Sequence, residues 1–215
     1  MLLAAGRGER LRPLTDQMPK ALVEVRGLSL LERHLHMLAG AGVQTVVINL
    51  GWHGERIVER VGGGRRYGLC VVYSPEYDQL LETGGGIVRA LPMLGARPFW
   101  VVNADVYTDY RVAAPDLADD SLGHLLLVPK PRERPRGDFH LEGGRVRNSP
   151  APDLTFGGIA CYRPELFAGC APGRFPLAPL LRQAAAEGRL TGSLFEGAWH
   201  DVGTAERLAV LNRSS

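Results

Sequence analysis

The chain has 215 residues, which is long enough to bury a substantial core in one large domain or two small ones. Its hydrophobic fraction of 45% and charged fraction of 22% are ordinary for a soluble globular protein, and a formal net charge of +2 gives no support to a nucleic-acid-binding surface. No apolar run approaches the ~20 residues of a membrane-spanning helix, and residues 1–6 lack the length and basic residues of a signal peptide. We therefore expect a cytoplasmic protein that binds neither nucleic acid nor a membrane.

The cysteines of the chain are Cys70, Cys161 and Cys170, an odd number without a CxxC pair. Disulfide frameworks and zinc sites need cysteines paired at suitable spacings. We expect reduced, structural thiols.

The first half of the chain alternates apolar runs with helical stretches. Residues 1–5 are a strand candidate ahead of a glycine-rich loop, and Ser29 and Glu32 have the spacing of a helix capping box. The helix that follows Ser29 is predicted to end at Gly40 and Gly42. Further strands are predicted at 45–50, 69–73 and 99–103, and further helices at 55–61 and 85–91. Uninterrupted apolar strands that alternate with helices are typical of a parallel sheet covered on both faces, with functional residues beyond the carboxyl ends of the strands.

The second half of the chain is less regular. The predicted elements are a strand at 124–128, a loop at 130–138, a hairpin of 139–141 and 145–147, a glycine-interrupted strand at 154–162, and helices at 177–187 and 204–211. No internal repeat, low-complexity tract or linker divides the chain. The predicted fold is a single Rossmann-like α/β domain over residues 1–215, with a mostly parallel central sheet flanked by helices.

A loop rich in glycine and arginine follows the first strand, with the sequence LAAGRGERLRPLT at residues 3–15 and Pro19-Lys20 shortly after. Glycines let backbone N–H groups approach phosphates, and arginine and lysine side chains supply positive charge. A dinucleotide-binding loop would read GxGxxG, but Leu11 stands at the third glycine position. The GxxxxGK[ST] pattern of a P-loop is also absent. The loop is therefore predicted to bind phosphate in another way.

The pattern L-A-A-G-x-G-x-R-[LM]-x-P-L-T followed by P-K is the signature of sugar nucleotidyltransferases, and this chain resembles that family. The resemblance implies that the loop wraps the triphosphate of a nucleotide and that Lys20 contacts phosphate. The nucleotide-binding residues carried over from it are Ala5, Gly6, Gly8, Glu9, Arg10 and Lys20. A purely structural turn is a poor alternative, because the match extends over so many positions.

Two aspartates lie far apart in the sequence but close to predicted strand ends. Asp105 follows the strand at 99–103, and Asp201 lies in WHDVGT just before the last helix. Taken singly, each aspartate fits a helix cap or a turn equally well. The family usually carries G-D at the first position, where this chain has Ala104, and W-x-D-[VIT]-G-T at the second. The resemblance thus implies that both carboxylates hold one Mg²⁺ ion, whose octahedral shell of oxygen ligands they suit.

Two histidines flank these motifs without a clear catalytic role. His200 is beside Asp201, but neighbours on a strand point to opposite faces, so an acid–base pair is not favoured. His53 follows the strand at 45–50, and a place in the cleft is the less favoured interpretation.

The segment LETGGGI at residues 81–87 follows the strand at 69–73. Three successive glycines at a helix entrance carry an entropic cost, which is explained if a flat base rests on the backbone. The resemblance places a uracil or thymine against Gly84 and Gly85. The alternative is an ordinary helix start capped by Thr83.

The motifs RGDF at 136–139 and LTFGGI at 154–159 resemble one branch of the family, the N-acetylmuramate-1-phosphate uridylyltransferases of bacterial cell-wall recycling. The resemblance implies a nucleotide-binding half at residues 1–110 and a sugar-phosphate-binding half at 111–215. The predicted contacts to the sugar phosphate are Asn103, Asp138, Thr155 and Gly157. Asn103 and Asp138 fit turn-stabilising roles as an alternative. Relative to the family, the opening strand lacks a few residues ahead of Met1.

The implied reaction joins UTP to a sugar 1-phosphate, N-acetylmuramic acid 1-phosphate, by in-line attack on the α-phosphorus, with pyrophosphate leaving. The predicted catalytic residues are Arg10, Lys20 and Asp105. Mannose, glucose or heptose phosphates are alternative substrates, and a regulatory subunit without turnover is an alternative of another class. The sequence is compatible with uridine or thymidine, with a monomer or a small homo-oligomer, and with a loop at 129–136 that closes over substrate.

Overall fold

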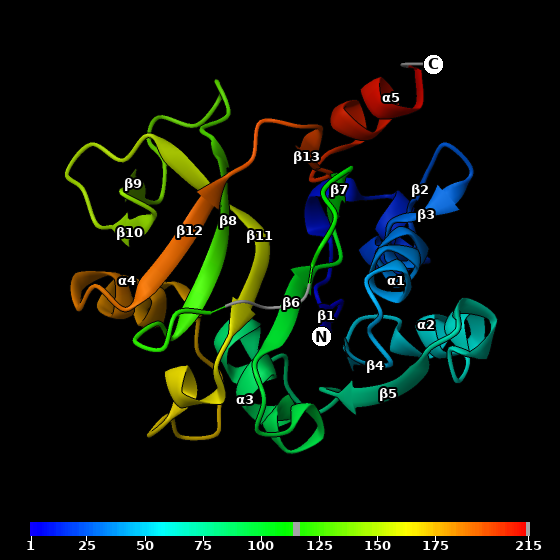
Figure 1. The fold of residues 1–215 in the computed structure, drawn as a ribbon. Coiled ribbons are helices and arrows are strands. Elements are labelled where there is room, and N and C mark those ends of the chain that lie inside the picture. The colour runs from blue at the N-terminus through cyan, green and yellow to red at the C-terminus, as the bar shows by residue number, and fades with distance from the viewer. Residues whose placement is uncertain (114–116, 214–215) are drawn as a thin grey trace.

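A computed structural model describes residues 1–113 and 117–213. Its centre is a nine-stranded sheet in the order β5-β4-β1-β6-β11-β8-β12-β10-β9 (Figure 1). The strands are β1 (Leu2–Leu3), β4 (Thr45–Leu50), β5 (Cys70–Pro75), β6 (Phe99–Asn103), β8 (Gly123–Pro129), β9 (His140–Glu142), β10 (Arg145–Arg147), β11 (Leu154–Tyr162) and β12 (Leu190–Leu194). The sheet runs through both halves of the chain.

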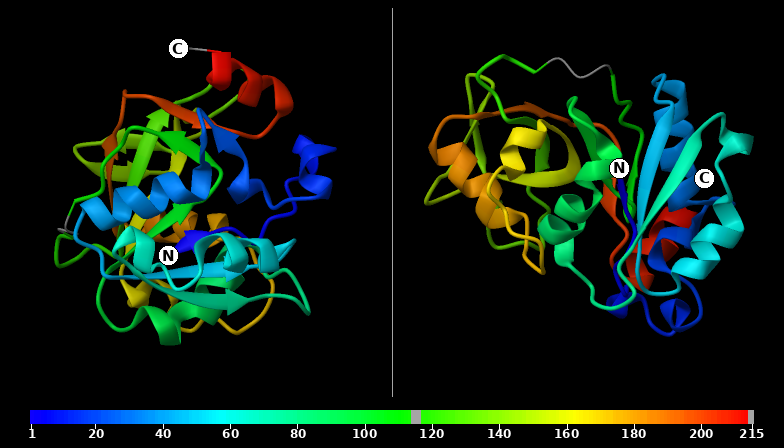
Figure 2. Two further views of the ribbon diagram at one scale, coloured as in Figure 1. Left: turned by 90° about the vertical axis from the view of Figure 1, so that its right-hand side faces the viewer. Right: turned by 90° about the horizontal axis from the view of Figure 1, so that it is seen from below.

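Helices cover both faces of this sheet. They are α1 (Leu30–Gly40), α2 (Gly54–Val61), α3 (Glu82–Leu94) and α4 (Ala178–Ala186), while α5 (Ala205–Arg213) packs against β2 in a separate small cluster. Leu35 of α1 and Ile57 of α2 are fully buried in one core cluster with Ile48 of β4. Ile87 of α3 and Leu181 of α4 belong to a second cluster on the other face, and Figure 2 shows the two helix pairs on opposite sides of the sheet. Each such buried side chain stabilises the fold by about 1.5–3 kcal/mol. The predicted Rossmann-like α/β fold is confirmed.

Parallel pairing dominates where the first half of the chain builds the sheet. β1 pairs in parallel with β4 and β6, and β4 pairs in parallel with β5. β11 then pairs antiparallel with both β6 and β8, while β8 and β12 are parallel. Because Leu3 is in register with both Asn49 and Asn103, the carboxyl ends of three neighbouring strands meet in one row.

Several short elements complete the fold. They are the strands β2 (Glu24–Val25), β3 (Leu28–Ser29), β7 (Val106–Thr108) and β13 (Trp199–Asp201), and the 3-10 helices η1 (Glu9–Leu11), η2 (Leu14–Asp16), η3 (Lys20–Leu22), η4 (Arg65–Tyr67) and η5 (Pro164–Phe167). β13 pairs antiparallel with β7, with Asp201 in register with Val106. This pairing connects the end of the chain to the segment that follows β6 (Figure 1). Within the described ranges, no helix has the length and apolar character needed to cross a bilayer.

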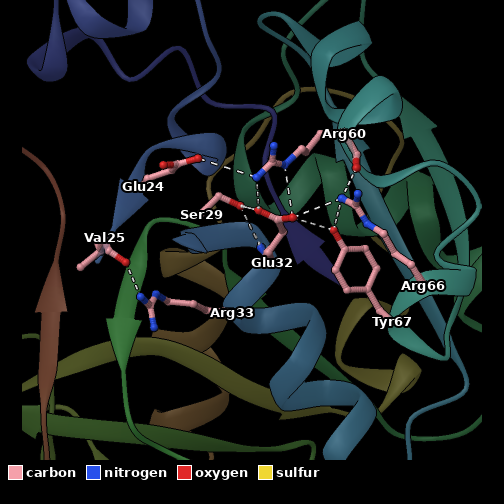
Figure 3. Close-up of polar contacts among 8 residues, drawn as sticks. All are labelled: Glu24, Val25, Ser29, Glu32, Arg33, Arg60, Arg66 and Tyr67. Carbon is pink, nitrogen blue, oxygen red and sulfur yellow. Dashed lines mark hydrogen bonds and ion pairs between the residues drawn. The ribbon is translucent and has the colours of Figure 1, made fainter. Parts of the chain in front are cut away.

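The start of α1 carries the predicted serine cap, but Glu32 accepts from the Ser29 hydroxyl instead of the Ser29 backbone N–H that a capping box would use. Ser29 Oγ accepts a hydrogen bond from the backbone N–H of Glu32 at 3.2 Å. The Glu32 carboxylate accepts from Ser29 Oγ at 2.7 Å, from Arg60 Nη2 at 3.0 Å and from the Tyr67 hydroxyl at 2.9 Å, and it also pairs with Arg66 at 3.2 Å (Figure 3). This buried carboxylate therefore joins α1 to α2 and η4.

The environment of Glu32 favours its ionised form. Burial alone would raise the pKa of this carboxyl group. Hydrogen bonds from Arg60, Ser29 and Tyr67, together with the charge of Arg60, outweigh burial and lower the pKa to about 2. Glu32 is a charged connection between elements at every pH near neutrality.

Candidate active site

A cavity of about 350 Å³ opens at the carboxyl ends of β1, β4 and β6. Five of the predicted site residues line it, namely Ala5, Gly6, Lys20, Asn103 and Asp105. A ligand site beyond the carboxyl ends of parallel strands is where an open α/β sheet places it. The cavity thus lies beyond the carboxyl ends of the strands, where the sequence pattern predicts functional residues.

The glycine-rich loop forms one rim of this cavity. Gly8 has φ +63°, and a Cβ there would lie 3.0 Å from the Lys20 Cβ, so both conformation and space require glycine. The Thr15 hydroxyl donates to the Gly8 carbonyl at 2.8 Å and closes the loop. Glu9 and Arg10 are exposed on η1, and the Arg10 side chain retains 67% of its accessible surface. The loop presents positive charge to solvent beside the cavity.

Lys20 lies between the two predicted metal ligands. Its ammonium nitrogen is 2.6 Å from Asp105 Oδ2 and 3.7 Å from Asp201 Oδ1. The β13–β7 pairing brings the aspartates together, and the backbone N–H of Val202 donates to the Asp105 carbonyl at 3.1 Å. Two carboxylates 96 positions apart in the sequence therefore face the ammonium group of Lys20.

The donor set around Lys20 fits a divalent cation. Carboxylate oxygens are preferred ligands of Mg²⁺, which usually takes one or two of them from the protein. Asp201 directs one oxygen toward Lys20, while its other oxygen lies 3.3 Å from Arg207 Nη1 and 3.9 Å from Arg10 Nη2. Ala104, where the family commonly has glycine, is buried in the core cluster that includes Ile48, and its N–H donates to the Leu3 carbonyl. The extra methyl group is accommodated without displacing Asp105 from this arrangement.

The glycines of α3 have a role different from the one predicted. The N–H groups of Gly84 and Gly85 both donate to the Phe175 carbonyl, at 3.1 and 3.2 Å. A Cβ on Gly85 would lie 2.0 Å from the Gly173 carbonyl oxygen. Only glycine fits at these positions, because the segment at 173–175 packs directly on the helix. Their donors are engaged by the chain itself, and Glu82 and Thr83, which precede them, line the cavity instead. The alternative of a Thr83 cap is not observed either, since Leu81 is the N-cap and no side chain caps the helix.

A buried hydrogen-bonded chain forms another wall of the cavity and was not identified from the sequence as a site feature. The backbone N–H of Ala4 donates to Asn49 Oδ1 at 2.7 Å, and Asn49 Nδ2 donates to Glu76 Oε1 at 2.8 Å. Glu76 Oε2 accepts from the backbone N–H of Leu81 at 2.9 Å. Asn49 and Glu76 are 3% and 1% exposed, and both line the cavity. The signal in the sequence was a single polar residue inside the apolar strand TVVINL.

Arg174 is a further cavity-lining residue, besides Asn49 and Glu76, that the motifs did not indicate. Its guanidinium pairs with Glu82 at 2.8 Å. Glu82 itself has φ +59°, an uncommon conformation for a residue with a side chain. The segment that packs against the α3 glycines thus also contributes a charged group to the cavity.

Of the four predicted sugar-phosphate contacts, only Asn103 lines the cavity. Asp138 Oδ2 accepts from the backbone N–H of Phe156 at 3.0 Å and pairs with Arg134 at 3.6 Å. Thr155 is 1% exposed, and its hydroxyl has no hydrogen-bond partner among the described residues. The carbonyl of Gly157 accepts from Trp199 Nε1 at 2.8 Å. Asp138, Thr155 and Gly157 therefore form a separate group along β11, outside the cavity.

The two histidines differ in position. His200 is exposed on β13 while Asp201 is partly buried, as the alternation of a strand predicts. His53 Nε2 lies 2.9 Å from the Asp16 carbonyl, at the end of the glycine-rich loop. His53 is not among the cavity-lining residues.

Comparisons with known proteins agree with this geometry. The MobA-like NTP transferase domain matches residues 1–172. The chain is 46% identical to an N-acetylmuramate alpha-1-phosphate uridylyltransferase of Neisseria meningitidis, over 97% of this chain and 94% of that relative. It is 36% identical to the enzyme of the same name from Caulobacter vibrioides, over 94% and 90%. The fold is shared with the crystal structure of UDP-glucose pyrophosphorylase complexed with UDP-glucose, with a TM-score of 0.78, 18% identity and coverage of 99% and 96%. The chain belongs to the MobA-like NTP transferase family.

Proposed function

We propose that this protein transfers the uridylyl group of UTP to N-acetylmuramic acid 1-phosphate, forming a nucleotide sugar and pyrophosphate. One observation carries the nucleotidyl transfer: the start of the glycine-rich loop, Lys20 and Asp105 line one cavity, and Asp201 lies 3.7 Å from Lys20. The acceptor is supported by the names of two relatives that the chain matches over almost its whole length. The proposal also includes a cytoplasmic location and a monomer or small homo-oligomer.

The wall formed by Glu76 supports a base that donates a hydrogen bond. A carboxylate oxygen accepts hydrogen bonds but cannot donate them. Uracil and thymine present an N3–H donor, whereas cytosine presents an acceptor at N3 and adenine an acceptor at N1. With Gly84 and Gly85 engaged by Phe175, Glu76 is the better candidate for reading the base. In the proposed site, Glu76 accepts from the N3–H of uracil or thymine, whereas cytosine and adenine would reach it only through their exocyclic amino groups.

The proposed chemistry needs no covalent intermediate. An ionised oxygen of the sugar phosphate attacks the α-phosphorus, the bond from that phosphorus to the bridging oxygen breaks, and pyrophosphate leaves with the electron pair. Arg10 and Lys20 offset the negative charge of the phosphates, and the loop of Gly6, Gly8 and Glu9 holds them in line. Asp105 and Asp201 would hold Mg²⁺, which supplies positive charge to the phosphate oxygens when bound.

We assign the nucleotide to residues 1–110 and the sugar phosphate to residues 111–215 of one domain. Asn103 supports this division because it lies where the two parts meet: a Cβ on Gly158 of β11 would come within 2.8 Å of Asn103 Nδ2. Thr155 and Gly157 would then contact the sugar from β11, and Asp138 from the segment that precedes β9. These three assignments depend on the branch of the family that the motifs resemble.

A matrix of nucleotides and acceptors tests the proposal. The purified protein would be assayed for pyrophosphate release with UTP, dTTP, CTP, ATP and GTP, each against N-acetylmuramic acid, mannose, glucose and heptose 1-phosphates. We expect the highest kcat/KM for UTP with N-acetylmuramic acid 1-phosphate. A higher value for another sugar would replace the proposed acceptor, and no turnover with any pair would favour a regulatory subunit.

The variant Asp105→Asn provides the control for the catalytic assignment. We expect it to keep the fold, because Asp105 is partly exposed, and to lose at least about 100-fold in kcat, because one oxygen ligand of the metal becomes a neutral amide. Unfolding temperature and kcat at saturating Mg²⁺ would be measured together. Unchanged kcat in the folded variant would contradict the metal assignment.

A further inference from the structure

The glycine-rich loop, residues 6–16, pairs with no strand in the part of the chain that the structure describes. It contains only η1 and η2, each of three residues, and most of its side chains are exposed. A phosphate-binding loop must nevertheless keep its donors in place, because ordering a loose loop on binding costs affinity. The contacts that fix this loop therefore affect how strongly it binds phosphate.

Trp52 and His53, in the turn between β4 and α2, make hydrogen bonds and a cation–π contact to this loop. Trp52 Nε1 donates to the Thr15 carbonyl at 2.8 Å, and the backbone N–H of Trp52 donates to the Ala5 carbonyl at 3.3 Å. His53 Nε2 lies 2.9 Å from the Asp16 carbonyl. One residue, Trp52, thus bonds the chain at both ends of the loop.

Two further observations strengthen this connection. The Arg7 guanidinium lies 5.8 Å from the centre of the Trp52 ring, within the range of a cation–π contact. Gly51 has no room for a side chain, since a Cβ there would lie 2.4 Å from the Ala5 carbonyl oxygen. Through the Thr15 hydroxyl, the anchoring also reaches Gly8 in the middle of the loop.

We propose that the turn Gly51-Trp52-His53 is a clamp that pre-organises the triphosphate loop, with Trp52 as its main positioning residue. This inference rests on the proposed nucleotide function of the loop. Trp52 and His53 do not line the cavity, so they act through the loop rather than on the substrate. Loss of the clamp weakens UTP binding and leaves the chemical step and the sugar-phosphate site unchanged.

The variant Trp52→Phe tests the clamp, because it removes the indole donor and keeps one aromatic ring. Trp100→Phe is its matched control: Trp100 is also partly buried, and its Nε1 donates to the Ala113 carbonyl at 3.0 Å, away from the cavity. We expect Trp52→Phe to raise KM and Kd for UTP about 5- to 10-fold, with kcat and the KM for the sugar phosphate within about 2-fold of wild type. Trp100→Phe should change none of these values.

Hydrogen exchange of the nucleotide-free protein gives a readout that does not need turnover. Faster amide exchange at 7–16 in Trp52→Phe, without a change in Trp100→Phe, supports the clamp. Wild-type UTP affinity or wild-type exchange of the loop in Trp52→Phe overturns it. If Trp52→Phe does not fold, His53→Asn carries the same test, because asparagine tolerates φ +52° but does not reach Asp16. A wild-type protein that binds no UTP would contradict the proposed function, and loop exchange would still test the clamp.

Discussion

Lys20 contacts two carboxylates, and the proposed reaction also requires it to contact phosphates. Its ammonium lies between Asp105 and Asp201 and is 13% exposed, so it offsets the repulsion between two negative groups in a partly desolvated position. A metal ion and the lysine cannot both occupy the space between these carboxylates. The phosphates of an incoming nucleotide offer Lys20 an alternative partner, and metal and nucleotide would therefore enter together.

Lys20→Met separates these two roles. We expect the variant to bind Mn²⁺ more tightly than wild type in the absence of nucleotide, by about tenfold or more, because the competing ammonium is gone. Its turnover should fall by at least about 100-fold, because the charge on the phosphates is also lost. Mn²⁺ titration followed by electron paramagnetic resonance measures the affinity. Lys130→Met, at the other lysine of the chain, should leave Mn²⁺ affinity unchanged, and equal affinity in Lys20→Met and wild type would contradict the competition.

Glu76 ends a chain of hydrogen bonds in which every direction is fixed. Asn49 accepts from Ala4 and donates to Glu76, which also accepts from Leu81. In Glu76→Gln, one of the two acceptors becomes an NH₂ group that faces a donor, and rotating Asn49 to compensate would strip Ala4 of its acceptor. We expect a loss of about 1–3 kcal/mol in the free energy of unfolding, measured by denaturant titration. A variant as stable as wild type would show that the network is not fixed in this direction.

At the scale of elements, long apolar strands were predictable and short strands were not. The strands at 45–50, 99–103 and 154–162 were predicted with both ends correct, because polar residues or glycines bound each apolar run. β7 and β13 have three residues each, too few for any periodicity, although their pairing brings Asp201 beside Asp105. The motif identified both aspartates, but their approach depends on a pairing that no local pattern encodes.

The α3 glycines show a different limit on what can be predicted from the sequence. From the sequence alone, these glycines are explained by a base that rests on their backbone. The partner is Phe175, about ninety positions further along the chain. A local sequence pattern indicates that space is needed without indicating which group fills it.

Because Glu32 connects α1 with α2 and η4, its ionisation makes the free energy of unfolding depend on pH. Its pKa is about 2 in the folded protein against an ordinary value of 4.5, so its contribution is complete above pH 4.5 and disappears as the pH falls toward 2. We expect Glu32→Gln to lower the free energy of unfolding by about 2 kcal/mol at pH 7, with a difference from wild type that shrinks below pH 4.5. Denaturant titrations at several pH values measure this difference. A difference that stays constant down to pH 3 would contradict the ion-pair origin.

At the scale of the whole molecule, the second half of the chain completes the site of the first. The segment at 173–175 packs on α3 and supplies Arg174 to the cavity, and β13 supplies Asp201. The motifs predicted five of the residues that line the cavity, and the β-α-β order predicted a site at the strand ends. The cavity wall of Asn49 and Glu76 was missed because it depends on contacts between segments far apart in the sequence.

Gly85→Ala measures the docking of these segments. Helix propensity alone predicts that alanine stabilises α3 by about 1 kcal/mol. The new Cβ would lie 2.0 Å from the Gly173 carbonyl oxygen, a backbone atom, so we expect a net loss of about 2 kcal/mol or more in the free energy of unfolding and a raised KM for UTP. Gly40→Ala in α1, where no atom lies within 4 Å of the added Cβ, is the control and should be neutral or stabilising. If Gly85→Ala raised the free energy of unfolding, the segment at 173–175 would have to move away from α3 at little energetic cost.

The contact between α3 and Phe175 also bears on how the protein unfolds. A fragment that ended after the nucleotide-binding half would expose the glycine face of α3 to water and leave two amide groups of that helix without their acceptor. Neither half would then be an independent cooperative unit, and denaturation would follow a single sigmoidal transition reported alike by all three tryptophans. A nucleotide that bound only to residues of the first half would therefore shift that transition for the entire chain.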